Sequence, residues 1–372
     1  MSEAGTQRAD RTGRAYIGSF TSAGGRGVTS AAVDPDGGGL TALHHTDAAV
    51  PNPSYLALSS GRDSAGALLY AVSETGEGAI AVFSLADPDR PVPAGEPAPV
   101  KGADPTHLAV AAGQVFTANY GSGGVSSLPL RADGTLGGQA AVHPHRGGGP
   151  NAGRQEGPHA HAVVPDPSGR WLLSVDLGTD SVWVYALSPA GGAEADAGGG
   201  PAGGALRLHR EVPVGEGTGP RHLAFHPDGR HAYLVNELKS TVTVCRWDAG
   251  EGALQPVAET PTVPEGAASG PNYPSELVVS PDAQYVWVAN RGHDSIAVLD
   301  LGASGDALHL VGTVPCGGHW PRDLALHPSG RRLYAANERS GDVTWFDLDP
   351  ETGVPRRAGS LAVAAASCVV FG

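Results

Sequence analysis

One sequence pattern recurs along nearly the whole chain. Its clearest copy is the segment 219–244, GPRHLAFHPDGRHAYLVNELKSTVTV, where a proline opens an apolar strand, a Pro/Asp/Gly turn follows, and a second apolar strand leads through a polar loop to a third. Copies begin at six prolines: Pro53, Pro105, Pro158, Pro220, Pro274 and Pro321. A unit of four strands that repeats roughly every 40 to 50 residues is typical of a β-propeller.

The two ends of the chain together supply one more unit. Residues 14–33, RAYIGSFTSAGGRGVTSAAV, match the second and third strands of the pattern but lack its first strand. Residues 367–371, SCVVF, match the missing first strand. We therefore predict an all-β fold, a seven-bladed β-propeller closed by pairing of the C-terminal strand with the N-terminal blade. Such closure removes the open sheet edges on which strands aggregate.

The repeat also sets the expected domain organisation. We expect residues 14–372 to form a single propeller domain, although the length alone favours two or three domains. Residues 1–13 are polar and without pattern, which predicts a flexible tail. Residues 188–205, SPAGGAEADAGGGPAGGA, are a low-complexity segment, which predicts a flexible loop on the outside of the ring.

Charge and cysteine content exclude several classes of partner. The formal net charge is −14, which argues against binding to nucleic acid or to an anionic membrane surface. No run approaches the ~18 apolar residues of a membrane-spanning helix, and no signal-peptide pattern opens the chain. Cys245, Cys316 and Cys368 form neither a CxxC site nor a disulfide framework. We expect a cytoplasmic protein without a cofactor.

The geometry of the repeated hairpin predicts where polar groups gather. The first strand of a blade lines the channel and the second returns after the turn, so the start of one and the end of the other share a face. This brings Arg221 and His222 to Glu237. With seven blades around one axis, equivalent positions converge at the mouth of the channel. They are Thr106, His107, His159, His161, Ser275, Glu276, Arg322 and Asp323 at strand starts, and Glu74, Asn119, Asp176, Asn236, Asn290, Arg291, Asn337 and Glu338 at strand ends.

Arginine is the informative residue type at this mouth. Its guanidinium is a rigid fork that matches the oxygens of a carboxylate or phosphate. Arg221, Arg291 and Arg322 near one opening of an acidic protein predict a small anionic ligand rather than a polyanion.

Structural roles compete with the functional interpretation at many of these positions. Turn, loop and capping roles fit His226 and His327 before the turn prolines, Asn236, Asn290 and Asn337 beside loop backbone, and Asp176, Asp180 and Asp294 at loop ends. Ion pairs between Arg322 and Asp323, or between Arg221 and Glu237, would brace neighbouring blades instead of binding a ligand.

A metal site is the third alternative. His159 and His161 are two residues apart, so a strand would place both imidazoles on one face. This is half of a possible metal site, yet local spacing offers no third ligand. We therefore expect no metal.

Several long motifs carry a resemblance to a known family. They are NPSYLAL (52–58), GPHAHAVVPDPSGRWLLSVDLGTDSV (157–182), GPRHLAFHPDGRHAYLVNEL (219–238), NRGHDSIAVL (290–299), WPRDLALHPSGRRLYAANE (320–338) and the terminal SCVVF. Across residues 14–371 the chain resembles the seven-bladed β-propeller lactonases, which include propeller-type 6-phosphogluconolactonases and the carboxy-cis,cis-muconate lactonizing enzyme. The resemblance implies that Arg221 and Glu237, in PRH…NE, belong to the site, together with Arg291 and with His159 or His161. Ala160 stands where other members carry a cysteine.

The expected function follows from this resemblance and from the residues at the mouth. We expect a lactonase that hydrolyses a small anionic lactone, foremost 6-phosphogluconolactone. The alternatives are a muconate-type lactonizing enzyme and a non-catalytic propeller that binds a protein partner. The expected catalytic residues are His159, His161, Arg221 and Glu237, with Glu237 or His161 as general base. The expected substrate-binding residues are His222, Arg291, His293 and Arg322.

Overall fold

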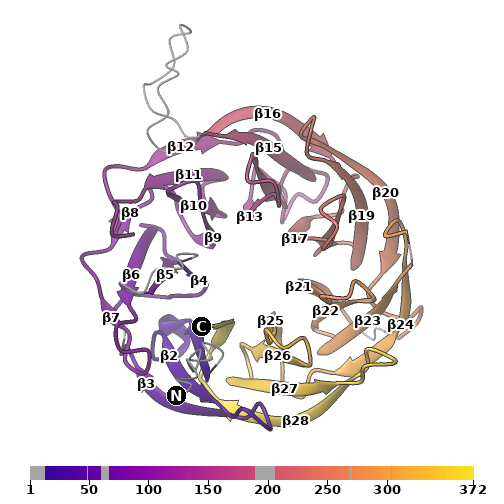
Figure 1. Ribbon diagram of the computed structural model, residues 1–372. Helices are drawn as coiled ribbons and strands as arrows, with labels where there is room; N and C mark the ends of the chain where they lie inside the picture. Colours follow the sequence, from indigo (N-terminus) through magenta and orange to yellow (C-terminus); the bar gives the residue numbers. More distant parts are fainter. Residues whose placement is uncertain (1–12, 48, 60–66, 189–205, 268–269, 303) are drawn as a thin grey trace, which may run out of the picture.

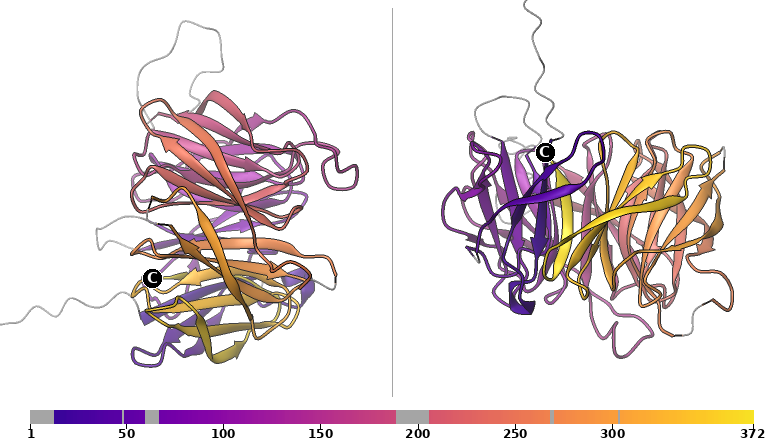
Figure 2. Two further views of the ribbon diagram at one scale, coloured as in Figure 1. Left: turned by 90° about the vertical axis from the view of Figure 1, so that its right-hand side faces the viewer. Right: turned by 90° about the horizontal axis from the view of Figure 1, so that it is seen from below.

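Seven antiparallel sheets surround a central axis (Figure 1). The computed structural model describes residues 13–47, 49–59, 67–188, 206–267, 270–302 and 304–372. Six sheets have four strands, and the seventh has a fifth, short strand. Seen from the side, the sheets stand around the ring with their loops on its two faces (Figure 2). The predicted seven-bladed β-propeller is confirmed.

Each blade runs from an inner strand at the axis to an outer strand at the rim. The inner strands are β29 (Ala366–Phe371), β4 (Leu56–Leu58), β9 (Pro105–Ala111), β13 (Ala160–Pro165), β17 (Pro220–Phe225), β21 (Tyr273–Val279) and β25 (Pro321–Leu326). The second strands are β1 (Arg14–Ser19), β5 (Leu68–Ser73), β10 (Gln114–Asn119), β14 (Trp171–Asp176), β18 (His231–Asn236), β22 (Tyr285–Arg291) and β26 (Arg332–Asn337).

The outer half of each blade completes the sheet. The third strands are β2 (Thr29–Val33), β6 (Ala79–Ser84), β11 (Gly124–Pro129), β15 (Ser181–Leu187), β19 (Thr241–Asp248), β23 (Ser295–Leu301) and β27 (Asp342–Leu348). The outer strands are β3 (Leu40–His45), β7 (Val92–Pro93) with β8 (Ala98–Pro99), β12 (Ala141–Pro144), β16 (Leu206–Pro213), β20 (Ala253–Pro261), β24 (Leu308–Pro315) and β28 (Pro355–Ala362). A short 3-10 helix, η2 (Thr21–Ala23), follows β1. Within the described residues, no helix is long and apolar enough to cross a membrane.

The first blade is assembled from both ends of the chain, as predicted. The last strand, β29, pairs antiparallel with β1, and Ala15 lies opposite Phe371 while Ile17 lies opposite Val369. Each inner strand contacts the inner strands on both sides, including β29 with β4 and with β25. The ring is therefore closed by main-chain pairing.

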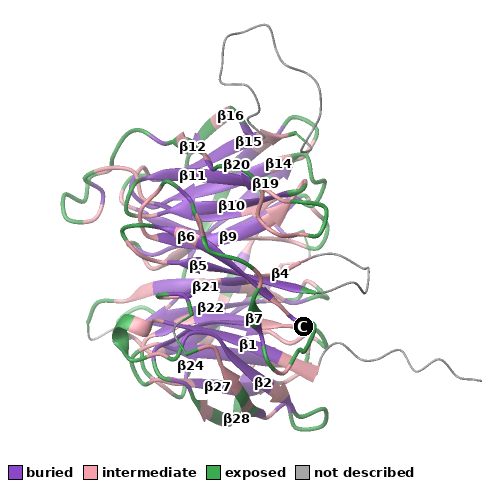
Figure 3. Cartoon of the chain, turned by 90° about the vertical axis from the view of Figure 1, so that its left-hand side faces the viewer, coloured by how far each residue is buried: buried purple, intermediate pink, exposed green. Residues whose placement is uncertain are grey.

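The hydrophobic core lies between blades rather than within them. Among the described residues, buried apolar side chains form seven clusters, and each cluster joins two adjacent sheets. One of them packs Ile17 and Val369 of the first blade against Tyr334 and Trp345 of the last. The three inner strands of each blade are accordingly mostly buried, whereas the outer strands and the loops are largely exposed or half-buried (Figure 3).

The repeated turn explains why the inner and second strands form hairpins. In HPDG the amide N–H of Gly229 donates to the carbonyl oxygen of His226 at 2.9 Å, and Gly229 has φ +68°. Glycine adopts this left-handed conformation without steric cost. Gly330 closes the turn after β25 in the same way, with φ +70°.

The unit predicted to begin at Pro158 begins two residues later than that proline indicates. Ala160, and not Pro158, pairs with Asp176 as Pro220 pairs with Asn236. The reason is that the Asp176 side chain accepts the backbone N–H of His159 at 2.8 Å, so that strand pairing begins only after His159. His161 is consequently the structural counterpart of Arg221. Residues 1–12 of the predicted tail and 189–205 of the predicted loop lie outside the described residues.

We expect loss of β29 to open the ring. Removing residues 366–372 leaves β1 without its inner partner and exposes the apolar cluster shared by the first and last blades. The shortened chain should unfold at a clearly lower temperature than the full chain in a thermal scan followed by circular dichroism. Removal of Gly372 alone is the control, and an unchanged midpoint for the longer deletion would contradict this view of closure.

Candidate functional site

A β-bulge at the start of the inner strands turns one residue out of the regular pairing. In β17, Pro220 pairs with Asn236 and His222 with Val235, which leaves Arg221 unpaired between them. Bulges re-aim side chains and are frequent beside active sites. We call the bulged residues the mouth layer: Thr106, His161, Arg221, Ser275, Arg322 and Ser367.

The mouth layer is tied together around the ring. The Thr106 hydroxyl donates to the backbone oxygen of His161 at 3.0 Å, the Arg221 guanidinium donates to the backbone oxygen of Ser275, and the Ser275 hydroxyl donates to the backbone oxygen of Pro321 at 2.7 Å. These bonds cross from one blade to the next and fix the side chains relative to one another.

Glu237 lies at the centre of a cluster of arginines. Its carboxylate accepts from Nη2 of Arg291 at 2.7 Å and from Nη2 of Arg154 at 2.5 Å, and lies 3.3 Å from Nε of Arg221. The Glu237 side chain is only 5% exposed. Arg322 lies apart from Glu237 and makes two longer contacts, each 3.5 Å, with Glu74 and Glu338.

The arginines decide the protonation of Glu237. Burial alone would raise the pKa of Glu237, but Arg291, Arg221 and Arg154 outweigh burial and lower it to about 2. A carboxylate held this firmly is a poor proton acceptor at neutral pH. Burial, together with Arg291 and Arg322, lowers the pKa of Arg221 to about 9. The cluster of Arg154, Arg221 and Arg291 around Glu237 therefore carries more positive than negative charge.

His161 faces the same mouth as a neutral imidazole. It is 5% exposed, and its Nδ1 has no hydrogen-bond partner. Burial, reinforced by Arg221, holds the pKa of His161 well below its usual value. His159 precedes β13 and stacks on the Tyr120 ring at 4.5 Å, while its Nδ1 lies 2.9 Å from the Tyr120 carbonyl oxygen. The rings of His161 and Tyr120 pack in a T-shaped arrangement with their centroids 5.7 Å apart.

The residues that follow Thr106, Arg221, Ser275 and Arg322, together with Tyr55 just before β4, form a second layer beneath the mouth. We call Tyr55, His107, His222, Glu276 and Asp323 the inner layer. Nδ1 of His222 lies 2.6 Å from a Glu276 oxygen, and the Glu276 and Asp323 carboxyls share a hydrogen bond. These five residues line one end of a cavity of about 500 Å³, which continues along the apolar inner strands to Pro165 and Pro328 near the turns.

The structure brings together most of the residues predicted from the sequence. Arg221, Arg291 and Glu237 are in mutual contact, and the predicted pair of Arg221 with Glu237 forms. His161 and His222 have ring centroids 5.1 Å apart. His293 is the exception, because its Nδ1 bonds the Ser295 hydroxyl at 2.7 Å in the loop between β22 and β23.

Some predicted contacts take a different form. The ion pair of Arg322 with Asp323, which was an alternative to ligand binding, does not form: Arg322 contacts Glu74 and Glu338, while Asp323 turns to Glu276. The capping role of Asp176 is confirmed, since it accepts the N–H groups of Gly178 and Thr179. Asp180 and Asp294 likewise accept loop N–H groups.

The recurring asparagines mostly bond to strand hydroxyls rather than to loop backbone. Asn236 donates to Thr243 at 2.8 Å, and Asn337 donates to Thr344 at 3.1 Å. Asn290 alone of the three donates to a backbone oxygen, that of Thr262.

Arg154 was not predicted. It lies between β12 and β13, in a segment that no repeat unit includes, and it reaches Glu237 across 83 positions of sequence. No spacing in the sequence signals this contact. Glu276 and Asp323 were recognised as strand starts, but their contact with each other depends on side-chain direction at the bulges of β21 and β25.

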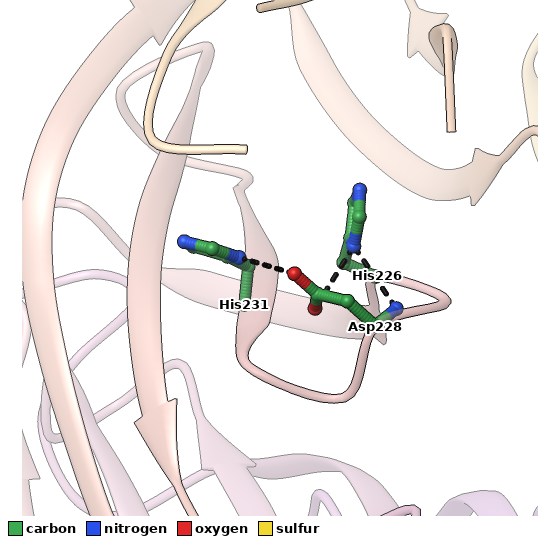
Figure 4. A group of neighbouring side chains, drawn as sticks. All are labelled: His226, Asp228 and His231. Carbon is green, nitrogen blue, oxygen red and sulfur yellow. Dashed lines mark hydrogen bonds and ion pairs between the residues drawn. The ribbon is translucent and has the colours of Figure 1, made fainter. Parts of the chain in front are cut away.

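A second group of histidines lies at the opposite end of β17 (Figure 4). Potential ligand atoms of His226, Asp228 and His231 lie within 4.8 Å of one another. Nδ1 of His226 accepts the backbone N–H of Asp228 at 3.1 Å, and Nδ1 of His327 accepts that of Ser329 in the equivalent turn at 3.2 Å. The same hydrogen bond thus recurs in the HPSG turn, where a serine replaces the aspartate at the third position. We therefore attribute the arrangement of His226 and Asp228 to the turn.

Known proteins resemble this chain along nearly its whole length. A family model described as "Lactonase, 7-bladed beta-propeller" matches residues 14–371. A 6-phosphogluconolactonase of Bacillus subtilis is 31% identical over 341 residues, which make up 91% of this chain and 92% of that protein.

Solved structures agree in fold. A putative 6-phosphogluconolactonase from Bacteroides fragilis superposes with a TM-score of 0.87 at 27% identity, covering 99% of this chain and 100% of that one. A periplasmic gluconolactonase from Pseudomonas aeruginosa superposes with a TM-score of 0.86 at 28% identity, covering 96% and 98%.

We expect the substitution Glu237→Gln to destabilise the protein. It removes the negative charge that three buried or half-buried guanidiniums share, and an unpaired buried charge costs about 3 kcal/mol or more. Urea denaturation at neutral pH measures the loss. The control is Glu259→Gln, which breaks the exposed pair with Lys239 and should cost under about 1 kcal/mol. Equal losses in the two variants would contradict the central role of Glu237.

The stabilisation by Glu237 should also depend on pH. Its pKa falls from 4.5 to about 2 on folding. A group whose pKa is lowered on folding stabilises the protein above its unfolded-state pKa, and this contribution is lost as pH falls through the folded-state pKa. The difference in unfolding free energy between wild type and Glu237→Gln should therefore be constant from pH 7 to about 5 and shrink between about 4.5 and 2. Urea titrations at several pH values check this, and a difference that grows on acidification speaks against it.

Proposed function

Because the chain belongs to the seven-bladed β-propeller lactonase family, we propose that it hydrolyses a small anionic lactone, 6-phosphogluconolactone, to the open-chain acid. Support for the substrate comes from the B. subtilis relative, which is named 6-phosphogluconolactonase. The observation that carries the proposal is the arginine cluster. Arg154, Arg221, Arg291 and Arg322 converge on one mouth of an otherwise acidic protein.

The arginines differ in how available they are to a ligand. Arg154 and Arg291 each donate to Glu237 at hydrogen-bond distance, and Arg291 also donates through Nε to the Tyr273 carbonyl oxygen at 3.0 Å. The contacts of Arg322 are longest, at 3.5 Å, so its donors exchange partners at least cost. We assign the phosphate of the substrate foremost to Arg322, and next to Arg291 because its charge lies near that of Arg322.

The chemistry needs a base, oxyanion stabilisation and a proton for the leaving oxygen. Water attacks the lactone carbonyl while His161 Nδ1 accepts its proton, and the negative charge that develops on the carbonyl oxygen is stabilised by Arg221. The ring C–O bond then breaks and the leaving oxygen takes a proton from His161. Glu237 serves to hold the three guanidiniums, since its two carboxylate oxygens already accept from Arg154 and Arg291.

The alternatives have less support. A muconate-type lactonizing enzyme would use the same arginines for a dicarboxylate, and substrate comparison separates the two. A partner-binding propeller calls for an apolar surface patch. Among the described residues, however, the large exposed apolar side chains stand singly on outer strands: Leu43, Val92, Val142, Leu208, Val257 and Val311. We also propose a cytoplasmic location, in keeping with Cys245, Cys316 and Cys368, which are all buried and free.

Hydrolysis of freshly generated 6-phosphogluconolactone, followed by pH-stat and corrected for spontaneous opening, tests the proposal. The wild type should accelerate opening strongly. Arg221→Ala should lower kcat by roughly 10²-fold, because it removes oxyanion stabilisation. The exposed variant Lys239→Ala serves as the control and should match the wild type. A wild type no faster than buffer would defeat the substrate assignment, and an unaffected Arg221→Ala would defeat the site.

The phosphate assignment has a separate test. Arg322→Ala should raise KM for 6-phosphogluconolactone by about tenfold or more, since a charge-assisted hydrogen bond to phosphate contributes roughly 1.5 to 3 kcal/mol. KM for unphosphorylated gluconolactone should hardly change. If KM rises equally for both substrates in Arg322→Ala, Arg322 does not bind the phosphate.

A further inference from the structure

The inner layer contains a chain of three hydrogen-bonded acids and bases that the proposed mechanism does not use. Asp323 is hydrogen-bonded to Glu276, and Glu276 lies 2.6 Å from Nδ1 of His222. The other carboxyl contacts come from backbone: Val369 N–H donates to Asp323 at 2.8 Å and Leu277 N–H to Glu276 at 2.9 Å. The three residues come from the adjacent strands β25, β21 and β17.

Two buried carboxyls in contact hold one proton between them at neutral pH. Burial raises the pKa of Glu276, and burial together with the neighbouring Glu276 charge raises that of Asp323. The titratable neutral groups that face the chain are Tyr55, His107, His161 and Cys368. The charged groups that face it are Arg221, Arg291, Arg322 and Glu237.

The carboxylate behind His222 distinguishes it from the other imidazoles of the channel. His107 and His161 have no carboxylate partner among the described residues, and the arginines oppose a positive charge on either. Burial and the same arginines also hold the pKa of His222 below its usual value, but its Nδ1–H can donate to Glu276, which leaves Nε2 as the basic nitrogen. An imidazolium that forms at His222 is the one that an adjacent negative charge stabilises.

Hydrolysis at neutral pH creates a proton that must leave the site. Lactone and water give a hydroxycarboxylate and one H⁺, because the product acid ionises. We propose that His222 takes up this proton at Nε2 and releases it to water in the cavity below, and that Glu276 and Asp323 are the positioning residues that make His222 able to do so. This proton path rests on the proposed function. It leads through the side of the inner layer that faces away from the substrate.

The geometry supports such a path. His222 lies between His161, with ring centroids 5.1 Å apart, and the cavity of about 500 Å³ that His222 and both carboxyls line. The proton would thus leave the mouth layer through an imidazole that a carboxylate contacts, which offsets the repulsion by the arginines. No covalent bond to the protein forms in this step, and no oxidant or other reactant is needed.

Kinetics of Glu276→Gln test the proposal. We expect kcat to fall by roughly 10²-fold, the usual effect of a lost proton-transfer group, while KM stays within about threefold because the arginines still bind the anion. Added imidazole buffer at fixed pH and ionic strength should restore much of the lost kcat, measured by product quantification against a buffer blank. The kcat of the wild type should not change with the imidazole concentration. A merely structural role would give no such rescue.

Two further variants sharpen the result. Asp323→Asn retains a hydrogen-bond donor toward Glu276, so it should lower kcat less than Glu276→Gln does, with the same direction of response to imidazole buffer. Tyr55→Phe removes a titratable hydroxyl from the same layer and should change neither kcat nor the response to buffer. The wild-type kcat should decline on the acidic side as the carboxyl pair takes up its second proton, and this decline should be absent in Glu276→Gln.

A measurement without substrate separates this proposal from the proposed function. In ¹⁵N NMR of histidine-labelled protein, His222, assigned through His222→Asn, should show a protonated Nδ1 and a free Nε2. Glu276→Gln should abolish this fixed tautomer, and Tyr55→Phe should retain it. A wild type without lactonase activity defeats the proposed function, whereas an unchanged His222 tautomer, a wild-type kcat, or an unrescued loss in Glu276→Gln overturns the proton path.

Discussion

The pairing of β29 with β1 is the constraint on which the remaining structure depends. Because apolar clusters form between blades, each blade needs neighbours on both sides to bury its faces, and an open arc would leave two faces exposed. Closure also fixes the inner strands as a ring around one axis. Only in a closed ring do Arg154, Arg221, Arg291 and Arg322, which come from separate blades and an interblade segment, reach the same few ångströms of space.

The bulge at the start of the inner strands converts this ring into a site. A regular strand would alternate its side chains between the two neighbouring blades, and the core would then absorb both. The unpaired residue breaks the alternation, so that two successive residues, such as Arg221 and His222, serve two different layers. One layer carries the positive charges, and the other carries a carboxyl pair and imidazoles. Strongly different electrostatic environments thus lie one residue apart.

Sequence periodicity was sufficient to predict the fold and much of the site. The repeat and the terminal SCVVF predicted seven blades and their closure, and the hairpin rule brought Arg221 to Glu237. Prediction from periodicity failed where contacts depend on irregular backbone. Arg154 lies in a connection without pattern, and the register of β13 depends on a single carboxylate, that of Asp176. The pairing of Glu276 with Asp323 instead of Arg322 with Asp323 depends on side-chain direction after a bulge, which strand alternation does not reveal.

The location of the apolar clusters between blades has a consequence for how the chain is made. Blade 1 lacks its inner strand until the ribosome has synthesised the other six blades, because β29 follows β1 by the entire ring. The nascent chain therefore carries an unfinished sheet for most of its synthesis, and its last contacts to form are also the most distant in sequence. A chain built in this way exposes unpaired strand edges for longer than one whose domains close on themselves as they emerge.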